Sequence, residues 1–71
     1  MNTNQQLLFN KIERARLLGR SMSFEIDEHT FEVSVKQSTS TNYHGLTHSI
    51  ASIMADGNKV TRKQAFAILE N

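Results

Sequence analysis

At 71 residues, with neither cysteine nor proline, the chain predicts one small domain that no disulfide can stabilise. It contains no apolar run long enough to span a membrane and no secretory leader, so we expect a cytoplasmic protein that does not enter a membrane. The formal net charge of only +1 is unlike that of a strong nucleic-acid binder, which needs many phosphate contacts.

The first expected element is a helix over residues 4–18. Leu8, Ile12 and Ala15 recur at helical spacing and predict one buried face. Thr3 followed three residues later by a glutamine fits a capping box at the helix start. Gly19 is well suited to end the helix, because glycine readily adopts the left-handed conformation found just beyond a helix C-terminus.

Residues 21–37 predict an antiparallel β-hairpin with one apolar and one polar face. Apolar and polar side chains alternate in two consecutive runs, which is typical of half-buried strands. A hairpin alone is barely stable in water, so the rest of the chain or a partner must cover its apolar face. The apolar positions are Met22, Phe24 and Ile26 in the first run and Phe31, Val33 and Val35 in the second.

The positions of these residues restrict the register of the hairpin. Both apolar sets share one face only if the loop has an even number of residues. We favour a four-residue loop over residues 27–30, because Glu28 and His29 suit the positive φ angles of a two-residue turn poorly. In that register Phe24 pairs with Val33, and Glu25 lies opposite Glu32 on the polar face.

Two further helices are expected, over residues 42–55 and 62–70. Apolar residues at steps of three and four predict the former, and an Asp-Gly-Asn turn beginning at Asp56 is expected to end it. Thr61 and Gln64 form a capping box at the start of the latter. The fold class is therefore α+β, a single domain over residues 1–71 of order α-β-β-α-α. The hairpin packs against an N-terminal helix and a C-terminal helix pair.

The polar face of the hairpin is the leading candidate for a protein-binding site. Four of the seven acidic residues lie in this segment, and charge complementarity would guide a basic partner to it. An open strand edge is the other candidate, because it can accept a strand from a partner or from a second copy in a homodimer. The acidic candidates are Glu25, Asp27, Glu28 and Glu32.

A nucleic-acid site at the start of the last helix is the alternative. A helix, a short glycine-containing turn and a second helix match helix-turn-helix geometry. Basic side chains in the first turn of a helix oppose its dipole, a local conflict of the kind found at functional sites. The residues concerned are Lys59, Thr61, Arg62, Lys63 and Gln64.

His44 and His48 would lie on one side of the helix predicted over residues 42–55, at a spacing compatible with metal binding. A third ligand is needed, and His29 is the only other histidine, so surface histidines without a metal are the favoured interpretation. Asp56 is the lone acid of its turn, which excludes a calcium loop of the EF-hand type.

No catalytic triad, cysteine nucleophile, phosphate-binding loop or dinucleotide fingerprint is present, so we expect neither an enzyme nor a cofactor. The expected function is that of a small cytoplasmic regulatory or adaptor protein that binds another protein. The alternative is a nucleic-acid-binding regulator.

Overall fold

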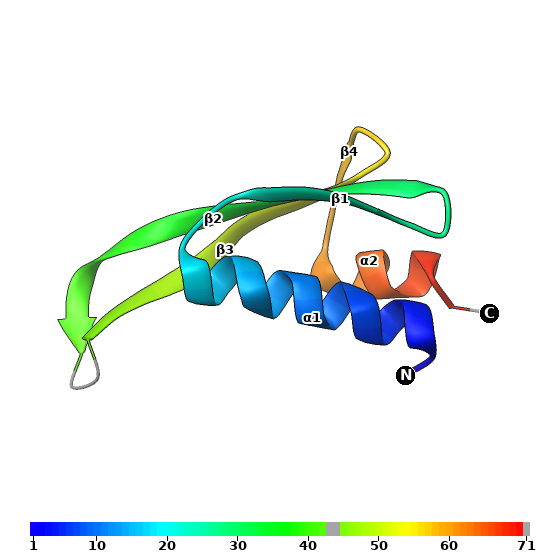
Figure 1. Ribbon diagram of the computed structural model, residues 1–71. Coiled ribbons are helices and arrows are strands. Elements are labelled where there is room, and N and C mark those ends of the chain that lie inside the picture. Colours follow the sequence, from blue (N-terminus) through cyan, green and yellow to red (C-terminus); the bar gives the residue numbers. More distant parts are fainter. Residues whose placement is uncertain (43–44, 71) are drawn as a thin grey trace.

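The computed structural model describes residues 1–42 and 45–70, with the side chains of 37–47 excluded. It is a small α+β domain in which two helices lie on one face of a four-stranded antiparallel sheet (Figure 1). The strands are adjacent in chain order, β1-β2-β3-β4. In order, the elements are α1 (Thr3–Leu18), β1 (Met22–Ile26), β2 (His29–Asn42), β3 (Gly45–Ala55), β4 (Asn58–Val60) and α2 (Arg62–Ile68).

Helix α1 confirms the predicted N-terminal helix and its buried face. Leu8, Ile12 and Ala15 are fully buried against the sheet. The N-cap is Asn2, which forms the capping box with Gln5, so the pair predicted one residue later is wrong. Gly19 ends the helix at φ 64° and ψ 30°, in the left-handed conformation that the sequence predicted.

The two helices are joined at one end by side chains of the α1 N-terminus. The Asn2 side-chain amide donates to the Leu69 carbonyl at 2.8 Å, and the Gln5 amide donates to the Phe66 carbonyl at 3.0 Å. The Leu69 carbonyl lies beyond the last residue of α2, where no helical N–H can donate to it, whereas the Phe66 carbonyl also accepts from the Leu69 N–H at 3.1 Å. The start of α1 and the end of α2 therefore lie on the same side of the sheet (Figure 1).

The β1–β2 hairpin has the predicted faces but not the favoured loop. Phe24 pairs with Phe31 rather than Val33, and the loop is the two-residue turn Asp27-Glu28. Both turn residues have positive φ, 52° and 65°, a conformation that aspartate tolerates better than most residues but that is unfavourable for glutamate. The even loop length and the shared apolar face are retained, and the Phe24 and Phe31 rings stack with centroids 5.8 Å apart.

The helix predicted over residues 42–55 is wrong, because residues 45–55 form strand β3. The register between β2 and β3 shifts twice, between Ser34 and Val35 and between Gln37 and Thr41. At the former shift, Ser34 pairs with Ser52 but Val35 pairs with Ile50. This β-bulge inserts Ala51 and changes the alternation of the strand. Apolar residues at Ile50 and Ile53 are therefore three apart, a spacing that imitates a helix.

The predicted helix pair is consequently absent from the described residues, and the element order is α-β-β-β-β-α. The Asp56-Gly57 turn joins β3 to the three-residue strand β4 instead of ending a helix. Helix α2 confirms the predicted last helix, with the Thr61–Gln64 capping box in place. The core lies between the sheet and the helices. Its buried members are Leu8, Ile12, Ala15, Ile26, Phe31, Val33, Ile53, Ala55, Ala65 and Leu69.

Candidate functional site

The acidic residues of the first hairpin do not form the predicted arrangement. Glu25 pairs with Thr30, and Glu32 pairs with Ser23, so the two glutamates are not opposite each other. Both are exposed on the sheet face that the helices leave open. Asp27 and Glu28 form the turn itself. The structure therefore divides the predicted acidic site between an open sheet face and the end of the hairpin.

An ion pair joins the two hairpin turns. His29 Nδ1 lies 2.7 Å from Asp56 Oδ2, and the Thr30 N–H donates to the other Asp56 oxygen at 2.9 Å. The hydrogen bond to Asp56 raises the pKa of His29, and the nearby acids Asp27 and Glu28 contribute to the same shift. The hydrogen bonds from His29 and from the Thr30 amide lower the pKa of Asp56. This pair fixes the relative positions of the turns.

The basic residues proposed for nucleic-acid binding lie on two elements. Lys59 is exposed on β4, while Arg62 and Lys63 are exposed in the first turn of α2. Thr61 and Gln64 are occupied in the capping box, with side-chain to backbone distances of 2.8 and 3.1 Å. Since α2 follows a β-hairpin, the helix-turn-helix geometry expected here is wrong. Nucleic-acid binding by the basic side chains stays a prediction.

Of the two histidines considered as metal ligands, His44 lies outside the described residues and His48 lies within them. The ring of His48 packs on the end of α1: an added Cβ at Gly19 would lie 2.8 Å from its Cε1 and Nε2 atoms. Its Nδ1 atom is buried and has no hydrogen-bond partner among the described residues. Within residues 1–42 and 45–70, no three potential ligands gather to hold a metal ion.

Strand β3 has an open edge beyond the point where its pairing with β4 stops. Strand β4 pairs only with Ile53, Met54 and Ala55 before the chain turns away into α2. In the described part of the chain, no strand pairs with Ser49–Ser52 on this side, although β2 pairs with Ser49, Ile50 and Ser52 on the other. The main-chain amides and carbonyls along such an edge are free to pair with another extended segment.

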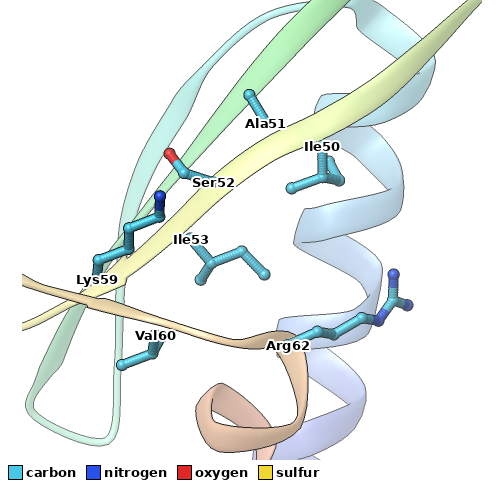
Figure 2. Close-up of a pocket in the computed structure, with 7 residues that line it drawn as sticks. All are labelled: Ile50, Ala51, Ser52, Ile53, Lys59, Val60 and Arg62. Atoms are coloured by element: carbon cyan, nitrogen blue, oxygen red, sulfur yellow. The ribbon is translucent and has the colours of Figure 1, made fainter.

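A hollow of about 320 Å³ lies beside this edge (Figure 2). Ile50 and Val60 are half-buried there and give it an apolar wall, while Ile53 is buried at its base. Lys59 and Arg62 supply exposed positive charges. Ala51 and Ser52 complete the lining, which combines an open strand edge with apolar and basic side chains.

Arg62 is held in place by two aromatic rings. Its guanidinium carbon lies 5.7 Å from the centre of the Phe9 ring on α1 and 5.9 Å from that of Phe66 on α2. Cation–π contacts of this kind restrict a side chain that is otherwise flexible. In Figure 2 the side chain of Arg62 extends toward α1, and that of Lys59 extends toward Ser52.

Sequence reasoning selected Lys59 and Arg62 but missed the apolar half of the hollow. Ile50 and Ile53 lie in the segment whose apolar spacing predicts a helix over residues 42–55, so the sequence does not predict an open strand edge there. One available signal was the Asp56-Gly57 pair between two apolar segments, which is typical of a two-residue hairpin turn. Read in that way, it predicts a strand on either side of the turn, as β3 and β4 are.

Comparison of the chain with protein-family models, with curated proteins and with solved structures gives no match. Among the described residues, neither helix is long and apolar enough to cross a membrane.

Proposed function

We propose that the chain is a small, non-enzymatic regulatory or adaptor protein of the cytoplasm that binds an extended segment of another protein along the open edge of β3. The observation that carries this proposal is that β4 leaves Ser49–Ser52 unpaired on the outer side. A segment added there would continue the sheet in line with β4. Binding of this kind takes affinity from main-chain hydrogen bonds and specificity from pockets for alternate side chains.

The hollow favours a peptide over a small-molecule substrate. Its volume of about 320 Å³ is at the lower end of the range for ligand pockets, about 300–1,000 Å³. The side chains that line it include no carboxylate, imidazole or thiol, the groups that most often perform acid–base or nucleophilic chemistry. A half-buried apolar wall next to a free strand edge suits one or two side chains of an added strand.

Selection from a random twelve-residue peptide library displayed on phage tests the proposal. Enriched peptides are synthesised and added to the ¹⁵N-labelled protein, and the shifts of its amide resonances are mapped. We expect the largest changes at Ser49, Ile50, Ala51 and Ser52. The failure of any peptide to be enriched, or changes confined to the sheet face around Glu25 and Glu32, would contradict the proposal.

N-methylated versions of an enriched peptide provide a matched control. Successive residues of an added strand direct their amides alternately toward β3 and away from it. Methylation of the amides that face β3 is expected to abolish binding, and methylation of the alternate set is expected to preserve it. Equal effects of the two sets would show that the peptide does not bind as a strand.

A further inference from the structure

The charge of the hollow indicates the chemistry of the segment that binds there. Lys59 and Arg62 are both exposed in its lining, and no acidic side chain lines it. Glu13 on α1 is near enough for Arg62 to contribute to lowering its pKa, but the larger cause is its hydrogen bond to Arg16 at 2.8 Å. The carboxylate of Glu13 is therefore already paired, and the positive charge of Arg62 remains available to a partner.

The two cations lie on opposite faces of the sheet at the end of β4. Val60 pairs with the buried Ile53 and belongs to the helix-covered face, so the preceding residue, Lys59, belongs to the open face. Arg62 extends toward α1 on the helix-covered side (Figure 2). A strand added along β3 projects side chains alternately to both faces. Of two neighbouring residues in that strand, one side chain would therefore lie on the side of Lys59 and the other on the side of Arg62.

Arg62 has the properties of a carboxylate anchor. The contacts of its guanidinium with Phe9 and Phe66 hold the group in place before a ligand arrives, which reduces the entropy lost on binding. The planar guanidinium presents parallel N–H donors that match the two oxygens of a carboxylate.

We propose that the segment bound at the β3 edge is acidic, with an Asp or Glu side chain paired with Arg62 and an apolar neighbour against Ile50 and Val60. Lys59 attracts a second acidic residue on the open face. This inference rests on the proposed function, because it specifies the partner of the same edge. Nucleic acid is disfavoured as the occupant, since residues 37–58, which include the whole of β3, contain no lysine or arginine to contact further phosphates.

The composition of the enriched peptides provides the first test. We expect Asp or Glu at one or two fixed positions next to an apolar residue. Enriched peptides that bind at Ser49–Ser52 without an acidic preference would overturn this inference and leave the proposed function standing. The absence of enriched peptides at that edge would overturn both.

Substitutions at Arg62 test the anchor directly with a synthetic enriched peptide. Arg62→Gln is expected to weaken binding about tenfold or more, since a hydrogen bond to a charged group contributes about 1.5–3 kcal/mol. It should also reduce the dependence of the dissociation constant on salt. Arg62→Lys keeps the charge but loses the paired donors, so an intermediate loss is expected.

Lys63→Gln is the matched control, because Lys63 is the next residue, is also exposed and does not line the hollow. It should leave binding nearly unchanged. Thermal unfolding of each variant checks that the fold survives the loss of the aromatic contacts. Equal effects of Arg62→Gln and Lys63→Gln would show that only general charge matters. A random single-stranded DNA pool is added as a competitor. If the DNA displaces the peptide and Arg62→Gln prevents this displacement, the proposal that the occupant is an acidic peptide is overturned.

Discussion

The contact between Gly19 and His48 predicts that Gly19→Ala is severely destabilising. Gly19 lies at φ 64°, where an alanine costs about 1–2 kcal/mol because its Cβ crowds the following carbonyl. The new Cβ would also lie 2.8 Å from two atoms of the His48 ring, and forcing apart such a contact costs about 1–3 kcal/mol. The sum of about 2–5 kcal/mol compares with a total stability of about 3–5 kcal/mol for so small a domain.

Urea unfolding followed by circular dichroism measures this change, and a second glycine separates its two causes. Gly57 has φ 83°, and nothing lies within 4 Å of the position its Cβ would take. Gly57→Ala should therefore show only the backbone cost of about 1–2 kcal/mol. Gly19→Ala in a His48→Ala background should likewise fall to the backbone cost, giving a coupling energy of about 1–3 kcal/mol between the two sites.

Two results would refute this reasoning. If Gly19→Ala costs the same with and without the His48 ring, the ring does not pack against the end of α1. If Gly19→Ala costs no more than Gly57→Ala, the close approach contributes nothing. Either result would show that the attachment of β3 to α1 at this point has been misassigned.

Three smaller changes probe the turns and the last helix. Glu28→Gly should stabilise the fold by about 1 kcal/mol, seen as a higher urea midpoint, because Glu28 has φ 65° and glycine adopts that angle without strain; an unchanged or lower midpoint would argue against the two-residue turn. The His29–Asp56 pair should stabilise most between the ordinary pKa values of the two groups, 3.8 for Asp and 6.5 for His. The pKa of His29 is raised, so its contribution is complete below 6.5 and is lost as pH rises through the folded value, while that of Asp56, whose pKa is lowered, is lost in acid. The melting temperature should therefore fall less between pH 5 and pH 8 in Asp56→Asn than in the unsubstituted protein. An identical fall in the two proteins would show that the His29–Asp56 pair does not contribute to stability. Thr61→Ala should cost about 1 kcal/mol in the same urea experiment through loss of the α2 cap, and no loss would show that the capping box is unimportant.

Local patterns determined the parts of the fold that depend on neighbours in sequence. Helix α1, the left-handed Gly19, the shared apolar face of the β1–β2 hairpin and the capping box of α2 each involve residues close together along the chain. For such elements the period of apolar residues and the identity of a few cap residues are sufficient. The same holds for Arg62, whose unusual position in the first turn of a helix is visible in the sequence.

Tertiary structure decided the features that depend on distant segments. Without the bulge at Ala51, the apolar residues of β3 would alternate and would predict a strand; with it, their three-residue spacing imitates a helix. Because the two-residue turn in the predicted register is Glu28-His29, local patterns likewise do not predict the Asp27-Glu28 turn. In the fold it accompanies the stacking of Phe24 on Phe31 and the pairing of His29 with Asp56. The β3 edge is open because β4 is only three residues long and the chain then turns into α2, so no strand lies beside Ser49–Ser52 in the described part of the chain. The sequence of β3 alone therefore does not predict whether its edge is open.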